Sequence, residues 1–367
     1  MVEYADMKVA VGLSGGVDSA VAALLLKRAG HDVVGVTMKL WREGRYRGGT
    51  RDACFGPGEA RDIAAAADFA RKIGIAYRVF DCFEEYERTV LDYFRRERAA
   101  GRTPNPCIVC NRHLKFGLLP QLAARELSFD RFATGHYARR VEAGGRLAVA
   151  RAADAAKDQS YFLWDLSQEQ LARTTFPLGD LTKGDVRRIA RDAGLAMAEK
   201  PDSQDFYSGD SDELLGAADR PGDIVAADGT VLGRHSGHWH YTVGQRQGLG
   251  IGGGTPYYVI RLDACRNQVV VGRRDEAVRR AFEVRDLNWQ GAAPTDDAVE
   301  GFVKIRSNGP PAGRATLAHG VVHAPDGLFG VAPGQSAVLY SADGAVLCGG
   351  VVAGPCESAG SGSGTNP

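Results

Sequence analysis

The sequence lacks an apolar run of the roughly 20 residues that a membrane-spanning helix needs. Its opening stretch, MVEYADMKVAVGLSGG, contains acidic residues and lacks the apolar core of a secretory signal. Cysteine is scarce and odd in number, 7 in 367 residues, which argues against the dense, even disulfide framework of small secreted proteins. We therefore expect a protein of the reducing cytoplasm with no membrane association.

A net charge of one sign is also lacking, because 45 Lys and Arg balance 45 Asp and Glu. The balance hides an asymmetry. Residues 86–157 carry 14 basic and 7 acidic side chains, whereas residues 158–230 carry 7 basic and 15 acidic ones. The basic block suits a polyanionic partner such as nucleic acid, and an ordinary solvated surface is the alternative.

Strand and helix patterns alternate over the first 200 residues. Apolar, β-branched runs predict strands at 8–13, 32–40, 76–81 and 131–137. Periodic segments predict helices at 20–30, 58–74, 84–101 and, despite Pro120, 112–127. This alternation predicts an α/β domain at 1–200, with a doubly wound parallel sheet whose ligand site lies at the carboxyl ends of the strands.

Helical periodicity fades after about residue 200, and short hairpin patterns with Asp-Gly and Arg-Asn turns replace it. We expect two small, mainly β modules, a central one at 201–278 and a barrel-like one at 279–356. The Gly/Ser-rich end, ESAGSGSGTNP at 357–367, predicts a disordered tail.

The string GLSGGVDSA at 12–20 stands between the first strand and the first helix. Gly15 and Gly16 let backbone N–H groups converge at a helix start, an arrangement that binds phosphate. A Walker A loop is excluded because the Gly-Lys-Ser/Thr ending is missing. A tight structural turn is the alternative, but the complete SGGVDS string favours a nucleotide loop.

Two of the cysteines, Cys107 and Cys110, stand three apart in PNPCIVCN. This spacing fits a corner of a metal or iron–sulfur site, a redox or sulfur-handling pair, or two small buried residues.

The SGGVDS loop resembles the pyrophosphate loop of the ATP pyrophosphatase superfamily, and further strings resemble one family within it, the tRNA 2-thiouridylases. In order, the strings are GRTPNPCIVCNRHLKFG (101–117), ATGHY (133–137), KDQSYFL (157–163), FPLGDLTKGDVRRIA (176–190), KPDSQDF (200–206) and VGQRQGLG (243–250). The resemblance covers about residues 8 to 355.

The resemblance implies a tRNA-uridine 2-sulfurtransferase. In such an enzyme ATP adenylates the 2-oxygen of the wobble uridine of tRNAs for Lys, Glu and Gln, releasing pyrophosphate, and a protein-bound sulfur then displaces AMP. It further implies ATP and Mg²⁺ as cofactors and the anticodon arm of tRNA as a partner. A persulfide or sulfide donor, such as a cysteine desulfurase or a relay protein, would supply the sulfur.

The family's site residues carry over onto matching positions of this chain. The implied ATP pocket comprises Gly12, Leu13, Ser14, Gly15, Gly16, Val17, Asp18, Ser19, Met38 and Gly135. The implied tRNA contacts are Asn105, Pro106, Cys107, His136, Lys157, Asp158, Gln159, Arg306 and Gln335. The implied catalytic residues are Cys110, which matches the family's first catalytic cysteine, Cys107, and Asp18 as an indirect organiser of magnesium.

Two positions depart from the family pattern. Cys107 stands where many family members carry Asp, although Cys is also a familiar variant there. The second catalytic cysteine, the usual persulfide carrier, aligns with Tyr207, which cannot hold a persulfide. We therefore expect Cys107 and Cys110 both to be required. Either one carries a persulfide that the other resolves as a disulfide, or the pair binds a [4Fe–4S] cluster with Cys54, or failing that Cys82, as the third ligand.

Two other classes of function remain open. A noncatalytic tRNA-binding paralogue is disfavoured by the intact SGGVDS loop, which a pure binder does not need. Another ATP pyrophosphatase, such as a lysidine synthetase or an amide-forming ligase, is disfavoured by the cysteine pair and by KDQSYFL.

Overall fold

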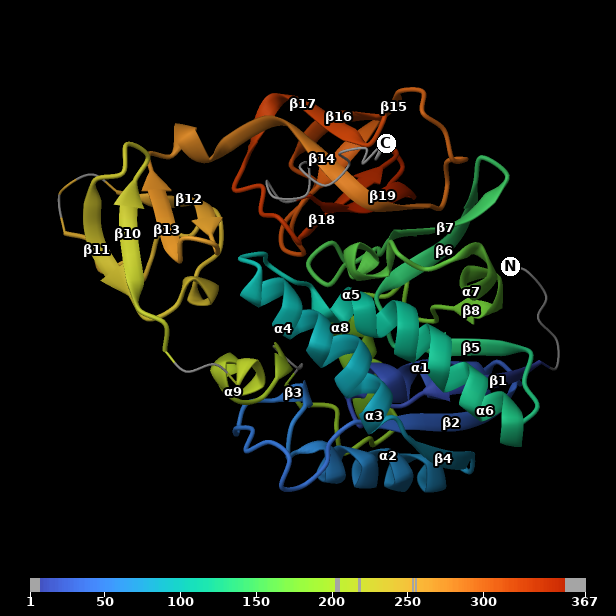
Figure 1. Cartoon of the computed structure of the whole chain (residues 1–367). Coiled ribbons are helices and arrows are strands. Elements are labelled where there is room, and N and C mark those ends of the chain that lie inside the picture. The colour runs from blue at the N-terminus through green and yellow to red at the C-terminus, as the bar shows by residue number, and fades with distance from the viewer. Residues whose placement is uncertain (1–6, 202–204, 217–218, 253, 255, 354–367) are drawn as a thin grey trace, which may run out of the picture.

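The computed structural model describes residues 7–201, 205–216, 219–252, 254 and 256–353. Figure 1 shows an α/β domain, a small β module to one side of it, and a β-barrel packed over it. None of the helices in these described ranges is long and apolar enough to cross a membrane. The tail expected at 357–367 lies outside the described residues.

A parallel sheet of five strands, in the order β4-β2-β1-β5-β8, forms the centre of the α/β domain. Its strands are β1 (Lys8–Gly12), β2 (Asp32–Lys39), β4 (Ala76–Asp81), β5 (Arg131–Thr134) and β8 (Thr174–Thr175). The central strand β1 pairs in parallel with β2 on one side and with β5 on the other. The chain therefore reverses its winding direction between β1 and β5, which confirms the predicted doubly wound α/β fold.

Helices cover both faces of this sheet because successive strand residues point to opposite sides. Val9 and Val11 of β1 pack in one hydrophobic core, and Ala10 packs in the other. The helices are α1 (Val17–Arg28), α2 (Glu59–Ile73), α3 (Phe83–Tyr86), η1 (Glu87–Leu91), α4 (Asp92–Ala99), α5 (Pro106–Val109), η2 (Cys110–Leu118), α6 (Leu119–Glu126), η3 (Ser160–Leu163), α7 (Gln168–Arg173), α8 (Lys183–Asp192) and α9 (Ser211–Leu215).

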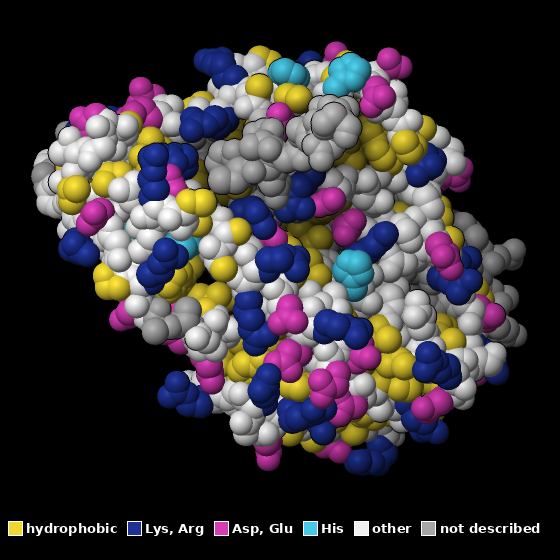
Figure 2. Space-filling model, in the orientation of Figure 1, with side chains coloured by type: hydrophobic (Ala, Val, Ile, Leu, Met, Phe, Trp, Pro, Cys, Tyr) yellow, Lys and Arg dark blue, Asp and Glu magenta, His cyan; other side chains and the backbone are white. Residues whose placement is uncertain are grey.

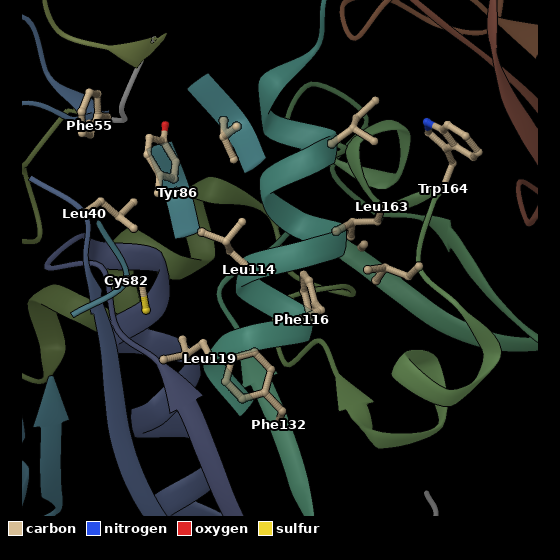
Figure 3. Packing of buried hydrophobic residues seen from close by; sticks show 14 of the residues in the cluster. Leu40, Phe55, Cys82, Tyr86, Leu114, Phe116, Leu119, Phe132, Leu163 and Trp164 are labelled. Atoms are coloured by element: carbon tan, nitrogen blue, oxygen red, sulfur yellow. The ribbon is translucent and has the colours of Figure 1, made fainter. Parts of the chain in front are cut away.

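The core on the Ala10 side joins the cysteine-bearing helix to the sheet. Figure 3 shows Phe116 and Leu119 of this helix beside Phe132 of β5. The rings of Phe116 and Phe132 meet edge to face with centroids 5.9 Å apart. This packing holds the cysteine-bearing helix against one face of the sheet.

Two short strand pairs within this domain were not predicted from the sequence. β6 (Ala138–Ala143) and β7 (Arg146–Arg151) form an antiparallel hairpin. Its turn, Gly144-Gly145, has positive φ at both residues, which was the available hairpin signal. β3 (Ala53–Phe55) pairs in parallel with β9 (Asp205–Tyr207), which lies far away in the sequence and left no local signal.

The rest of the described chain is mainly β. The small module is a four-stranded sheet in the order β11-β10-β13-β12, from β10 (Gly222–Ala226), β11 (Val231–His235), β12 (Tyr258–Asp263) and β13 (Gln268–Gly272), with one turn of helix, η4 (His238–His240). After η5 (Asp275–Ala277), a closed barrel follows, from β14 (Val278–Trp289), β15 (Val299–Lys304), β16 (Gly313–Ala318), β17 (Val321–Phe329), β18 (Ser336–Tyr340) and β19 (Val346–Val352).

A buried amide ties the barrel to the α/β domain. Gln290 donates from Nε2 to the carbonyl oxygens of Leu163 at 3.0 Å, Trp164 at 2.8 Å and Leu166 at 3.2 Å. Its Oε1 accepts from the N–H of Val149 at 2.9 Å. These bonds satisfy buried backbone groups that would otherwise be left unpaired. The barrel and the α/β domain therefore form one packed unit.

Candidate active site

Hydroxyl groups and a tight glycine hold the loop between β1 and α1 in shape. The Ser19 hydroxyl accepts from the Ser14 N–H at 3.1 Å and lies 3.2 Å from the Ser14 hydroxyl. Gly15 has a φ of +71°, and a Cβ there would come within 2.3 Å of the Asp62 carbonyl oxygen. Only glycine fits such a position, because its φ is positive and the Asp62 backbone occupies the space that a side chain would need.

The ends of two neighbouring strands, β5 and β2, lie beside the loop between β1 and α1. Gly135 follows β5, and a Cβ there would lie 2.6 Å from the backbone nitrogen of Ser19. Met38 lies near the end of β2, the neighbour of β1 on the other side. The structure thus brings Gly12 to Ser19, Met38 and Gly135 to one edge, at the point where the winding of the sheet reverses.

Asp18, in the first turn of α1, is held by two side chains from outside the loop. Lys183, at the start of α8, donates from Nζ to both carboxylate oxygens at 2.8 Å. Tyr137 donates its hydroxyl to Oδ1, also at 2.8 Å. Near the other side of the loop, Lys200 donates to Oδ1 of Asp62 at 2.6 Å. Neither lysine was assigned a role from the sequence, although both stand in strings that resemble the family, FPLGDLTKGDVRRIA and KPDSQDF.

The cysteine pair lies on a long helix made of α5, η2 and α6. Pro120 in α6 has no N–H, so the carbonyl of Phe116 loses its usual helical donor. Gln170 of α7 supplies a replacement, because its Nε2 donates to the carbonyl oxygens of Arg112 at 2.7 Å and Phe116 at 3.1 Å. This external amide explains why the predicted helix continues through the proline.

Cys107 and Cys110 stand one turn apart at the start of this helix, and so on one face. Burial raises the pKa of Cys107 from 9.0 to about 12 and that of Cys110 to about 11. The charge of Lys115 opposes both shifts, but burial outweighs it. Both thiols are therefore protonated at neutral pH in the free protein.

The [4Fe–4S] cluster expected at Cys107, Cys110 and Cys54 stays a prediction. Charge interactions do link these three thiols to the buried Tyr86, against which Phe55 packs with ring centroids 5.0 Å apart (Figure 3). Within the described ranges, however, no three His, Cys, Asp or Glu side chains gather in an arrangement that could hold a metal ion. We therefore derive no chemical step through a cluster.

The two candidates for a third ligand differ in their exposure. Cys54 is exposed on the short strand β3, whereas Cys82, the alternative third ligand, is buried after β4. Burial and neighbouring acidic groups raise the pKa of Cys82 to about 12.

Tyr207, at the position of the missing second cysteine, is a structural residue of β9. Its side chain is buried, and its ring packs on Phe55 with centroids 5.7 Å apart. The hydroxyl accepts from the Gly48 N–H at 3.2 Å and donates to the Glu213 carboxylate. A polar cavity of about 580 Å³ adjoins this strand, lined by Gly48, Gly49, Thr50, Arg51 and residues 205–211.

Three of the expected tRNA contacts lie around the cysteine helix. Asn105 and Pro106 begin that helix, and Pro106 occupies its first turn, where a missing N–H costs nothing. His136 follows β5, stacks on Phe116 with centroids 5.6 Å apart and bonds Thr134 through Nδ1 at 2.8 Å. Burial lowers the pKa of His136 well below 6.5, so the ring is neutral.

Asp158 corrects the expected tRNA footprint, because its side chain is only 1% exposed. Its Oδ2 lies 3.7 Å from Nζ of Lys304 in the barrel and 3.6 Å from Nε of Arg151. Ser160 donates its hydroxyl to the same oxygen at 3.0 Å. Asp158 therefore serves the joint between the barrel and the α/β domain, and it is not available for direct contact with tRNA.

The remaining expected contacts are partly or fully exposed. Lys157 and Gln159 are half-buried, and Gln159 also accepts from the Tyr137 N–H at 2.9 Å. Gln335 of the barrel donates to the Thr103 carbonyl at 3.3 Å, just before the cysteine helix. Arg306 is exposed and donates to the Gly330 carbonyl at 3.1 Å. Figure 2 shows Lys and Arg side chains gathered near the centre of the face where the three parts meet.

Three protein-family models together match almost the whole chain. A family model described as "tRNA methyl transferase HUP domain" matches residues 7–207. Models described as "tRNA methyl transferase PRC-barrel domain" and "Aminomethyltransferase beta-barrel domain" match residues 214–273 and 279–352. The fold and the glycine loop define a nucleotide-using enzyme with a HUP-type domain.

Curated relatives give the family more closely. A tRNA-specific 2-thiouridylase MnmA of Endomicrobium trichonymphae is 44% identical over 95% of this chain and 99% of its own length. One from Xanthobacter autotrophicus is 45% identical over 93% and 90%, respectively. The chain belongs to the tRNA-specific 2-thiouridylase family. This confirms the resemblance drawn from the motifs, and with it the prediction of an enzyme that thiolates uridine in tRNA.

A solved 4-thiouridine synthetase in complex with RNA and ATP is a much more distant likeness. It is 18% identical with a TM-score of 0.35, over 56% of this chain and 44% of its own. That likeness carries no argument about the site.

Proposed function

We propose that this enzyme replaces the 2-oxygen of the wobble uridine in tRNAs for Lys, Glu and Gln by sulfur, through an adenylated intermediate. The observation that carries the proposal is the presence of a glycine loop at a helix start and a half-buried thiol pair near the same edge of the sheet. Met38, beside the loop, and Cys110 both pack against the hydrophobic core on the Ala10 side of the sheet. We infer that one substrate base meets both sets of groups.

In the first step, the 2-oxygen of uridine attacks the α-phosphorus of ATP. A new O–P bond forms, the bond from the α-phosphorus to the bridging oxygen breaks, and pyrophosphate leaves. The N–H groups of Gly15 and Gly16 and the positive end of α1 are placed to stabilise the leaving charge. Mg²⁺ that enters with ATP would neutralise phosphate charge, and Asp18 is the carboxylate of the loop.

In the second step, a persulfide on one thiol of the pair attacks C2, a C–S bond forms, and AMP leaves with the original oxygen. The partner thiolate then attacks the inner sulfur of the enzyme-linked disulfide, so that 2-thiouridine departs and a Cys107–Cys110 disulfide remains. Helical residues three apart fall within the Cα separation of about 4.4–6.8 Å that disulfides use. An external thiol reductant restores the pair.

The remaining groups would place the tRNA. The tRNA would contact the start of the cysteine helix at Asn105 and Pro106, and His136 beside it. The contact surface would extend toward the barrel through Lys157, Gln159, Arg306 and Gln335. Uridine must leave its base stack to reach the thiols. A cysteine desulfurase or relay protein of the cytoplasm would supply the sulfur.

Reconstitution with purified protein tests this function directly. Unmodified tRNA for Lys, Glu or Gln, ATP and a persulfide donor should give 2-thiouridine, AMP and pyrophosphate in equal amounts, measured by mass spectrometry of nucleosides. Cys110→Ser should give none. Binding of tRNA without AMP formation would instead identify a noncatalytic paralogue. Methyl transfer from S-adenosylmethionine, the activity that the family-model descriptions suggest, is the control reaction and should be absent.

A further inference from the structure

The nucleotide loop contains no cation of its own, although it faces a substrate with several negative charges. The string GLSGGVDSA has no Lys or Arg, and its one charged residue is Asp18. Backbone N–H groups and a helix terminus carry only partial charges. A cation from elsewhere in the fold would therefore complete the phosphate site.

Two lysines reach the loop from different parts of the chain. Lys183, in the first turn of α8, bonds both oxygens of Asp18 at 2.8 Å. Lys200 bonds Asp62 at 2.6 Å and lies 3.5 Å from the carbonyl oxygen of Gly15 in the loop itself. Gly15 in turn touches the backbone of Asp62. Each ammonium group is thus connected to the glycine turn by one or two hydrogen bonds.

We infer that Lys183 and Lys200 hold the β- and γ-phosphates of ATP, and that Asp18 and Asp62 hold these lysines in place before the nucleotide arrives. The inference rests on the proposed function and names the residues that bind its leaving group. Neither lysine was assigned a role from the sequence.

The burial of the pairs makes this exchange favourable. The Lys183 side chain is only 11% exposed, so most of its water is already removed before ATP binds. Moving the ammonium from a carboxylate to a phosphate replaces one charge-assisted hydrogen bond with another. The side chain is also already ordered, by Asp18 and by the nearby Tyr137 ring, which lies 5.8 Å from Nζ. Little desolvation and little side-chain entropy remain to be lost on binding.

The alternative is that both ion pairs only stabilise the fold. Substitutions in the Lys200–Asp62 ion pair can distinguish phosphate binding from a structural role, because Asp62 lies on α2 and not in the glycine loop. Lys200→Met removes the cation, whereas Asp62→Asn breaks the same ion pair and leaves the cation in place. A structural pair predicts equal effects of these two substitutions, and a phosphate-binding lysine predicts unequal ones.

The experiment measures binding of an ATP analogue with a methylene group between the α- and β-phosphorus atoms, by titration calorimetry. Lys183→Met and Lys200→Met should each weaken its binding about ten- to a hundredfold, the usual effect of losing a hydrogen bond to a charged group. Asp62→Asn should bind the analogue as well as the wild type or better. AMP, which lacks the β- and γ-phosphates, should bind all variants alike.

Lys27→Met is the matched control, because Lys27 bonds the Gly74 carbonyl at an exposed site and its loss changes the net charge equally. Unchanged binding of the analogue by both lysine variants would overturn the inference, as would equal losses for AMP and the analogue. Failure of the wild type to bind the analogue at all would instead contradict the proposed function.

Discussion

The carboxylate of Asp158 lies 3.7 Å from the ammonium of Lys304, and neither side chain is more than 4% exposed. The two residues belong to different parts of the fold, the α/β domain and the barrel. Burial lowers the pKa of Lys304, and the charge of Asp158 opposes that shift. An ion pair of this kind is costly to break from one side, because the partner charge stays buried.

Asp158→Ala should therefore destabilise the protein by about 3–5 kcal/mol, measured by denaturant unfolding. The double variant Asp158→Ala with Lys304→Met removes both charges and should recover part of that loss. Binding of tRNA by the folded single variant should stay at the wild-type level. A specific loss of tRNA affinity with normal stability would restore Asp158 to the footprint.

Asp18→Ala should abolish formation of AMP and pyrophosphate and leave tRNA binding largely intact, because the loop serves the nucleotide. Coupled pyrophosphate release and filter binding of labelled tRNA measure the two effects separately. Asp68→Ala is the control, since Asp68 is exposed on α2 and pairs with Arg71 on the same helix. Thiolation at the wild-type rate by Asp18→Ala would show that the loop has another role.

The thiol pair should respond to pH in a defined direction. Burial raises the pKa of Cys110 from 9.0 to about 11 and that of Cys107 to about 12. The folded state thus keeps protons that the unfolded state loses above about pH 9, so this contribution to stability is complete below pH 9 and is lost as pH rises toward 11–12. Thermal unfolding from pH 8 to 11 should show a smaller decline for Cys110→Ser.

The order in which the cysteines of the free protein are alkylated should follow the exposure of their side chains. Iodoacetamide at pH 7.5 should label the exposed Cys54 and Cys265 before Cys107 and Cys110, as measured by peptide mass spectrometry. Rapid labelling of the pair would show that the thiols are more accessible than the structure indicates. Cys107→Ser and Cys110→Ser should each abolish thiolation, and full activity of Cys107→Ser would exclude the disulfide step.

Tyr207→Phe should leave thiolation intact, because the hydroxyl serves Gly48 and Glu213. Loss of these bonds should lower stability by about 1–3 kcal/mol, since Glu213 loses a buried donor. Activity is read as 2-thiouridine formed at a temperature well below unfolding. A loss of activity without a loss of stability would give Tyr207 a role in catalysis.

Binding of tRNA should weaken steeply with salt, because every neutralised phosphate releases counterions. Arg139→Glu with Arg140→Glu, on β6 within the basic block, should lower affinity and reduce the salt slope. Arg71→Glu with Arg78→Glu, elsewhere on the α/β domain, makes the same change in net charge and is the control. Equal dissociation constants for the first pair and the wild type at low salt would remove Arg139 and Arg140 from the footprint.

Local sequence patterns were sufficient to predict the main helices and strands of the α/β domain. Helix α2 ends where Gly74 adopts the left-handed conformation, as the glycine in the sequence predicted. The strands that carry the glycine loop, Met38 and Gly135 were likewise found from short apolar runs. Their convergence follows from the rule that parallel strands present their carboxyl ends at one edge.

Long-range pairing lay beyond those patterns. Lys183 meets Asp18 across 165 residues, and no local property of either position indicates the other. Asp158 stands in a string that resembles a tRNA contact, but its burial depends on Lys304 in a separate part of the chain. Gln170 of α7 likewise donates hydrogen bonds to backbone carbonyls of the cysteine helix, a different helix from its own. Such relationships arise from tertiary packing and become visible only in three dimensions.

The amide of Gln290 has a consequence for how such enzymes can be recombined. Its bonds reach carbonyl oxygens at three positions of the α/β domain and one N–H in the β6–β7 hairpin. All of these partners are backbone groups, so any barrel that keeps a glutamine at position 290 can make the same bonds. A transplanted barrel with an apolar residue there would leave the four backbone groups unpaired in a buried interface, and such chimaeras should yield insoluble protein.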